Sequence, residues 1–173
     1  MNGAGSNRGY GRPTLRIGAH IAALLAMLGG TDASALDCLV SATGVAFGVY
    51  DVALATPTDS VGSLTVRCVY QDGGATRVSY TVALSTGNSG TYAQRQMRSG
   101  TSTLNYNLFD SATYARMWGN GTAGSALMSG SLIVNRGNFA TNEAVHPIYG
   151  RIPAQQSADS GTYSDQVLVT LTF

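Results

Sequence analysis

Strict alternation of apolar and polar residues is the feature that most restricts what this chain can fold into. In segments 64–70, 78–84 and 167–173 every second residue is apolar or aromatic. This is the period-two pattern of a half-buried β-strand, whose successive side chains point to opposite faces. No segment after residue 35 carries a convincing apolar stripe with the 3.6-residue period of a helix. The sequence therefore predicts an all-β domain.

The last eleven residues, 163–173, are expected to form one such strand. Its apolar face would carry Val167, Val169, Leu171 and Phe173. Exposed sheet edges are usually blunted by charge, proline or a covering element, and the only charged side chain in this segment is Asp165. The pattern predicts a strand with one edge free to pair with a strand from another chain.

The remaining strand signals predict an antiparallel sandwich. Segments 64–70 and 78–84, with the turn residues Gln71–Gly74 between them, indicate a β-hairpin. A first strand over 38–47 is interrupted at Gly44. Weaker strands are expected at 104–108, 132–134 and 145–152. Short strands separated by turn signals favour a sandwich of the immunoglobulin type, with a small barrel as the alternative.

The first 35 residues have the pattern of a secretory signal peptide. Three arginines precede the run Ile17–Gly30, and Ala33–Ala35 supplies a small-x-small cleavage site. Fourteen mostly small residues fall short of the roughly 20 that a spanning helix needs. We expect residues 1–35 to direct export and residues 36–173 to form a single domain.

Charge and cysteine content narrow the function further. Residues 36–173 contain seven arginines, eight acidic residues and no lysine, a formal charge of −1. Nucleic acids and anionic membranes are therefore poor candidates for partners, because both need a concentrated basic face. We also expect no insertion of residues 36–173 into a membrane. Cys38 and Cys68 are the only cysteines, and in an exported chain they predict one disulfide. Zinc is the weaker alternative, since two cysteines without a nearby histidine give too few ligands.

The sequence contains little that suggests catalysis. His146 is the one histidine after residue 35, and no partner for it can be named. Asp110, Asp159 and Asp165 would form a carboxylate pair only if the fold happened to bring two of them together. Nucleophile-elbow, zinc-protease and phosphate-loop motifs are not found. We expect no enzyme activity, no cofactor and no metal.

A turn after the only tryptophan is a candidate exposed loop. Asn120-Gly121 is a strong tight-turn dipeptide, and Trp118 lies just before it. Trp118, Asn120 and Gly121 either form a hairpin end held by an aromatic residue or an exposed adhesive loop. The chain's other aromatics are expected mainly in packing.

Several segments, taken in order, resemble the spore coat protein U domain family, which includes subunits of archaic chaperone–usher pili. They are Cys38–Ser41, Val45–Asp51, Gly62–Cys68, Tyr80–Gly87, Arg95–Met97, Leu104–Phe109, Trp118–Gly121, Tyr149–Ile152 and Gly161–Phe173. No single segment is specific, but the ordered set spans nearly all of 36–173.

The resemblance implies an incomplete immunoglobulin-like β-sandwich that lacks its final strand. A periplasmic chaperone would lend a strand to the resulting groove, and an outer-membrane usher would exchange it for the N-terminal extension of a neighbouring pilus subunit. Val167, Val169, Leu171 and Phe173 would help to line this groove, and the Phe173 carboxylate would meet basic residues of the chaperone. The protein would be exported to the periplasm and then reach the cell surface, in a pilus or in secreted form.

The short segment before Cys38 departs from the family pattern and suggests where in a pilus the subunit would stand. Cleavage after Ala35 leaves two residues before Cys38, too few for a donor strand that advances about 3.3 Å per residue. The chain would accept a strand and donate none, as a tip or terminal subunit does. An independent spore-coat or matrix component, or a carbohydrate-binding sandwich, is the alternative.

Overall fold

The computed structural model describes residues 36–70, 75–134 and 141–173. The predicted signal peptide lies outside these residues, as do the turn residues Gln71–Gly74. The described residues form eight strands and one short 3-10 helix, η1. The elements are β1 (Leu36–Thr43), β2 (Thr58–Tyr70), β3 (Thr76–Leu84), η1 (Gly87–Ser89), β4 (Arg95–Ser99), β5 (Ser102–Phe109), β6 (Met128–Val134), β7 (Thr141–Ile152) and β8 (Val169–Thr172).

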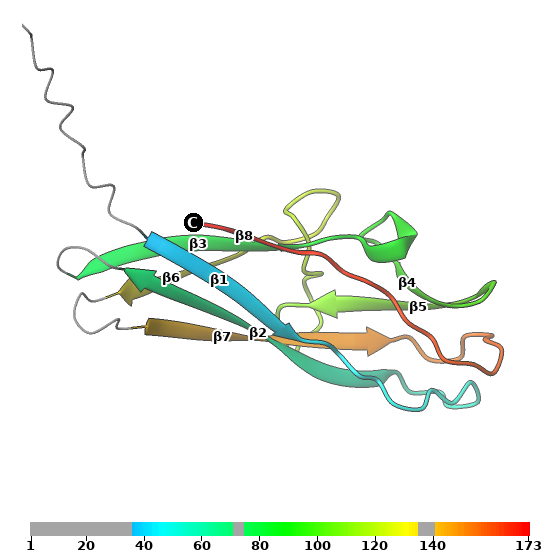
Figure 1. The fold of residues 1–173 in the computed structure, drawn as a ribbon. Helices are drawn as coiled ribbons and strands as arrows, with labels where there is room; N and C mark the ends of the chain where they lie inside the picture. The colour runs from blue at the N-terminus through cyan, green and yellow to red at the C-terminus, as the bar shows by residue number, and fades with distance from the viewer. Residues whose placement is uncertain (1–35, 71–74, 135–140) are drawn as a thin grey trace, which may run out of the picture. The chain divides into compact units, whose positions relative to one another are not determined.

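The strands form two sheets that face each other (Figure 1). One sheet has five strands in the order β1-β2-β7-β5-β4, and the other has three in the order β6-β3-β8. All described ladders are antiparallel. The predicted all-β class and sandwich architecture are therefore confirmed.

The core lies between the sheets and follows the period-two pattern of the sequence. On β2, Leu64, Val66 and Cys68 are fully buried, whereas Arg67 between them is exposed. On β3, the alternate residues from Val78 to Leu84 are buried in the same way. Each strand thus contributes one apolar face to a shared core, which is the main source of stability in such a fold.

The predicted hairpin between 64–70 and 78–84 is wrong. Both segments are strands, but β2 pairs with β1 and β7 whereas β3 pairs with β6 and β8. The two strands face each other across the core. Alternation determines which face of a strand is buried, but it does not identify the neighbour with which the strand pairs.

The disulfide prediction is confirmed. Cys38 of β1 and Cys68 of β2 are direct cross-strand partners, and they form the Cys38–Cys68 bond. β1 is an edge strand, so the disulfide fastens that edge to β2, the next strand of the five-stranded sheet. The predicted first strand is shorter than expected, because β1 ends at Thr43, one residue before Gly44.

The C-terminal strand is also shorter than predicted. Only Val169–Thr172 forms a continuous ladder, with β3. Segment 163–168 makes a single bridge, between Ser164 and Arg98 of β4, before it crosses to β3. Its side chains nevertheless keep the predicted alternation, with Tyr163, Asp165 and Val167 half-buried and the residues between them exposed. In the described part of the chain, no helix is long and apolar enough to cross a membrane.

Candidate strand-acceptor groove

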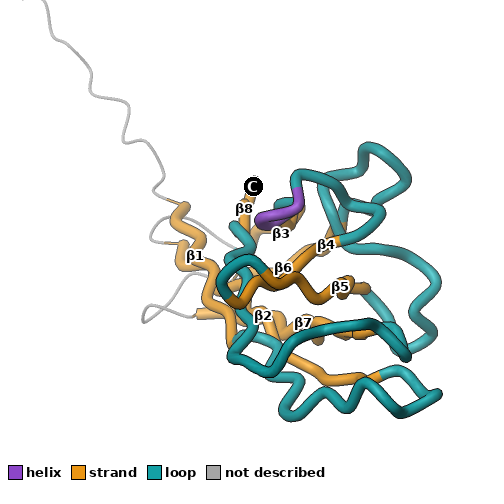
Figure 2. Tube along the Cα trace, turned by 90° about the vertical axis from the view of Figure 1, so that its right-hand side faces the viewer, coloured by secondary structure: helices purple, strands orange, loops and turns teal. Residues whose placement is uncertain are grey.

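Two extended segments form the walls of a groove at one side of the sandwich. The first wall continues β1 and runs from Ala42 to Val52. The second wall is the C-terminal segment from Tyr163 to Val169. In Figure 2 β1 and β8 lie at the same side of the molecule, and the two strands come close to each other.

Two glycines hold the first wall against the five-stranded sheet. A Cβ atom on Gly62 of β2 would lie 2.6 Å from the Thr43 carbonyl oxygen. A Cβ atom on Gly150 of β7 would lie 2.6 Å from Val45 and 2.7 Å from Phe47. All three distances are shorter than ordinary Cβ contacts, so the glycines allow the wall to cross the sheet closely and to place Val45 and Phe47 over it.

The groove between the walls is apolar. Its central part is a cavity of about 370 Å³. Buried core residues form the floor: Leu84, Met97, Tyr106, Leu108 and Ile148. Val45 and Phe47 line it from the first wall, and Val167 and Val169 line it from the second. The open groove thus exposes a strip of the hydrophobic core, which is unfavourable in water unless something covers it.

A second cavity of about 760 Å³ extends the groove toward the end of β7. It shares Val45, Phe47, Met97 and Tyr163 with the central part. The first wall is anchored here by Tyr50, whose hydroxyl donates to the Pro153 carbonyl at 2.9 Å and accepts from the Gln156 amide at 2.8 Å. The two cavities together form one continuous groove.

The geometry of the walls suits an extended peptide. Among the described residues, no backbone hydrogen bond joins 42–52 to 163–173. The outer edge of β8 has no strand partner there, and neither does the outer edge of β1. A strand entering the groove would find free backbone donors and acceptors on the walls and apolar pockets on the floor, the two elements of β-strand addition.

One polar cluster interrupts the apolar lining. Asp165 accepts hydrogen bonds from the Tyr106 hydroxyl at 2.8 Å and from the Asn88 amide at 2.9 Å. Burial raises the pKa of Tyr106, and its bond to Asp165 raises it further. The hydroxyl therefore stays protonated, and the Asp165 carboxylate ties the second wall to β5 and to η1.

The four predicted groove residues are not all placed in the groove. Val167 and Val169 line the cavity. Leu171 is half-buried and packs against the core without lining the cavity. Phe173 is 52% exposed and lines a depression on the outer face of the three-stranded sheet, beside Ser79 and Thr81. The structure does not bring Phe173 into the groove, because it follows Thr172, the last residue paired with β3.

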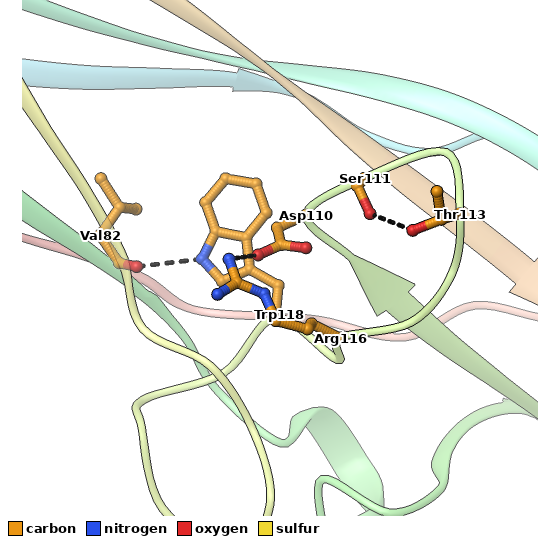
Figure 3. A network of polar contacts seen from close by, with 6 residues as sticks. All are labelled: Val82, Asp110, Ser111, Thr113, Arg116 and Trp118. Carbon is orange, nitrogen blue, oxygen red and sulfur yellow. Dashed lines mark hydrogen bonds and ion pairs between the residues drawn. The ribbon is translucent and has the colours of Figure 1, made fainter.

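The prediction of an exposed loop must be corrected for its tryptophan. Asn120 and Gly121 are exposed, but Trp118 is only 1% exposed. Its indole Nε1 donates to the Val82 carbonyl at 3.0 Å, which fixes the ring against β3 (Figure 3). Trp118 thus holds the base of the loop, as in the first of the two interpretations.

The titratable residues considered for catalysis lie in separate contacts. His146 shares a 2.8 Å hydrogen bond with Tyr80 across the sheets. Asp110 pairs with Arg116 (Figure 3), and the Asp159 amide contacts Ser102. Burial lowers the pKa of His146. The His146 imidazole and the Asp110 carboxylate thus each have a structural partner, whereas Asp159 is engaged through its backbone amide.

A buried polar cluster around Arg95 was missed by sequence reasoning. Arg95 is fully buried. Its guanidinium donates to the Ser85 carbonyl at 3.0 and 2.8 Å, to the Trp118 carbonyl at 2.7 Å and to Asn107 Oδ1 at 2.7 Å. Burial lowers the pKa of Arg95, but arginine remains protonated in proteins. The lone charge in the segment Arg95–Met97 was not itself a signal of burial, because arginines are usually exposed.

Comparisons with known proteins agree with this geometry. The sequence profile of the Spore Coat Protein U domain matches residues 24–170. Protein U of Myxococcus xanthus is 31% identical over 134 residues, which are 73% of this chain and 70% of that protein.

Among solved structures, the chain is similar to one from the CsuC–CsuE chaperone–tip adhesion subunit pre-assembly complex of the archaic chaperone–usher Csu pili of Acinetobacter baumannii. The TM-score is 0.51 and the identity 25%, over 80% of this chain and 40% of the other. The present chain thus spans less than half the length of that chain. The sandwich, the disulfide and the sequence match together show that this protein belongs to the Spore Coat Protein U domain family.

Proposed function

We propose that this protein is a structural subunit of a chaperone–usher pilus, and that it is assembled by accepting a β-strand in the groove between 42–52 and 163–173. The observation that carries the proposal is the open groove itself, whose floor is the hydrophobic core and whose walls have unpaired strand edges. A donor strand would complete the sandwich and cover this core. The similarity to a structure of a chaperone–subunit pre-assembly complex supports the same mode of assembly.

The proposed partners follow from this route. A periplasmic chaperone would occupy the groove first, an outer-membrane usher would mediate the exchange, and a neighbouring pilus subunit would provide the final strand. The final location is the cell surface. Adhesion and a part in biofilms would follow from membership of such a fibre.

We further propose that the subunit accepts a strand without donating one, at the tip or another terminal position. The predicted cleavage site after Ala35 supports this, because Leu36 is already paired with Tyr70 in β1. Sequencing the N-terminus of the exported protein tests the position. A start well before Leu36, with an alternating extension of about ten residues, would exclude it and leave the acceptor role intact.

A self-complemented chain tests the acceptor role. A ten-residue strand of alternating valine and threonine is joined to Phe173 through a flexible glycine–serine linker, long enough to let the strand return along β8. The control carries the same residues shifted by one position, which turns the polar face to the core. We expect the in-register fusion to be monomeric at low concentration and to unfold at a temperature about 10 °C or more above that of the control. A gain of 1 kcal/mol shifts the midpoint of a domain this size by several degrees.

Substitutions on the second wall provide a matched pair. Val167→Asp places a charge in the groove, whereas Leu168→Asp changes a side chain that is 69% exposed on the other face. Val167→Asp should remove the stabilisation by the fused strand, and Leu168→Asp should keep it. The acceptor role is wrong if the fused strand stabilises neither variant, so that the Val167→Asp and Leu168→Asp fusions both unfold at the temperature of the chain without a fused strand.

The family description supports one second candidate, an independent component of a spore coat. In that case the unmodified chain would be a soluble, cooperatively folding monomer that copurifies with no chaperone. Coexpression with the chaperone of a chaperone–usher system, followed by affinity purification, distinguishes the two: a stable one-to-one complex supports the pilus subunit.

A further inference from the structure

The outer face of the five-stranded sheet carries an apolar patch that takes no part in the groove. Six residues that point away from the core make up this outer-face patch: Val61, Phe109, Tyr114, Val145, Pro147 and Tyr149. Val61 is 56% and Val145 63% exposed. Pro147 is exposed as well, and the three aromatic residues are half-buried against one another. A contiguous apolar patch on a sheet face is a candidate interaction site.

The strand register makes the patch continuous. Tyr149 of β7 pairs with Val61 of β2 on one side and with Phe109 of β5 on the other. Tyr114 comes from the loop after β5 and packs edge-on against both Phe109 and Tyr149, with ring centroids 5.4 and 6.3 Å apart. Its backbone has φ 54°, an uncommon value for a non-glycine residue, so the loop holds this ring on the sheet despite a conformational cost.

An ion pair closes each end of the patch. At one end Arg67 of β2 lies 3.6 Å from Glu143 of β7. At the other end Arg151 of β7 contacts Asp59 of β2 through two hydrogen bonds of 2.7 Å. These charges remain partly exposed, with side-chain exposures between 34% and 52%.

The order of the four charges is self-complementary. β2 carries its negative charge at the Asp59 end and its positive charge at the Arg67 end, whereas β7 carries the opposite sequence of charges. When two such faces meet around a two-fold axis along the strands, β2 of one copy faces β7 of the other, and every charge meets its opposite. A two-fold axis across the strands has the same result, because the Asp59 end then faces the Arg67 end. Isologous interfaces require this self-complementarity.

We propose that the outer-face patch is a contact between two copies of this chain, which pack their five-stranded sheets face to face. The apolar side chains form the centre of the contact and the four ion pairs form its rim, an arrangement typical of protein interfaces. Face-to-face packing of twisted sheets is a common solution in β-sandwiches. The contact lies on the sheet face opposite the core, so it is independent of what fills the groove.

The patch predicts weak association in solution. Between Asp59 and Arg67 the sheet extends for about 27 Å at 3.4 Å per residue, and a patch this short covers less than the roughly 800 Å² per partner of a standard interface. We expect a dissociation constant on the order of 100 µM. Copies held close together in a fibre or coat would associate more completely, because tethering raises the effective concentration.

Sedimentation velocity of the exported chain, with its groove filled by the fused strand, tests the contact from about 5 µM to 1 mM, a range that brackets the expected constant. We expect monomer at the low end and dimer at the high end. Val61→Arg should weaken the dimer at least tenfold. Ile133→Arg, which changes an equally exposed strand residue on the other sheet, should leave it unchanged.

Exchanging the charges of the Arg67–Glu143 pair then determines the direction of the two-fold axis. The double variant R67E with E143R keeps the ion pair within each copy. The dimer should persist if the two-fold axis runs along the strands and should weaken if the axis runs across them. Monomer at every concentration overturns the proposal, and so does a dimer that Val61→Arg leaves intact.

Discussion

The two sides of the C-terminal segment 163–173 differ in how their backbone groups are satisfied. On the paired side, Ser164 bonds to Arg98, Leu168 accepts from the Ser85 amide, and β8 forms its ladder with β3. On the groove side, described residues supply no backbone partner. The same segment therefore pairs with neighbouring strands along one edge and has no strand partner along the other.

The side chains below the two sides differ as well. Beneath the paired side lies the fully buried Arg95, which donates to the Ser85 and Trp118 carbonyls. The floor of the groove is almost entirely apolar. Where the chain must satisfy carbonyls that no strand reaches, it uses a buried guanidinium. Where the proposed donor strand would be added, the floor consists of apolar pockets. One side of the segment is thus completed by the chain itself, whereas the other side has no strand partner among the described residues.

Removal of the buried guanidinium should have the largest effect on the paired side. Arg95→Met leaves two carbonyls and Asn107 without their donor. Because unsatisfied buried groups are costly, we expect a loss of about 4 kcal/mol in the free energy of unfolding. Urea unfolding measures this loss, with the groove filled by the fused strand. Arg98→Met, at an exposed side chain of the same strand, is the control and should cost less than about 0.5 kcal/mol.

Removal of the disulfide tests the groove side, because the bond links β1 to β2 and the first wall continues from β1. Replacing Cys38 and Cys68 together by serine should lower the free energy of unfolding by about 3 kcal/mol, the typical value for a loop of this length. Affinity for a donor strand should also fall, since β1 loses its covalent link to β2. Unchanged urea unfolding and unchanged donor affinity would show that β1 is held by its ladder alone.

A smaller change probes how closely the first wall must approach the sheet. Gly150→Ala places a methyl group against Val45 and Phe47, so the wall has to shift, at an expected cost of about 1 to 3 kcal/mol. Gly44→Ala meets no atom within 4 Å and serves as the control. Calorimetry measures the unfolding of both variants with and without the fused strand, and so shows whether the loss of stability depends on a filled groove. The role given to Gly150 is wrong if the two alanines behave alike.

The smallest expected effect concerns pH and the contact between His146 and Tyr80. Burial lowers the pKa of His146 below its unfolded value of about 6.5. The unfolded chain therefore binds the proton more readily, and stability should be fully present above pH 6.5 and decline as the pH falls below it. Solvent screening limits the decline to under about 0.5 kcal/mol. His146→Gln should remove this part of the pH profile of unfolding, and an identical profile would exclude His146 as its source.

The sequence predicts which faces of the strands are buried much better than it predicts which strands pair. The alternation correctly indicates which residues of 163–171 face inward, since burial of a strand face leaves a local signature, but it places the exposed Phe173 on the wrong face. It does not reveal that 163–168 lacks a ladder, nor that β2 and β3 pair in different sheets, because pairing depends on distant strands. Local patterns also gave no sign that Arg95 and Trp118 are buried together, as their contacts join residues far apart in the chain. Gly150 lies within the predicted strand 145–152 and Gly62 just before the predicted strand 64–70, but the sequence did not reveal the wall that packs against them.

The position of the disulfide has a consequence for the timing of assembly. The bond forms between β1 and β2, at the start of the strand that continues into the first wall. Before the thiols are oxidised, β1 is held to β2 by its backbone ladder alone. The first wall of the groove would then be held less rigidly than in the oxidised protein. On the proposed route of assembly, oxidation of the two thiols in an oxidising compartment would precede efficient docking of a donor strand and would act as a checkpoint before polymerisation.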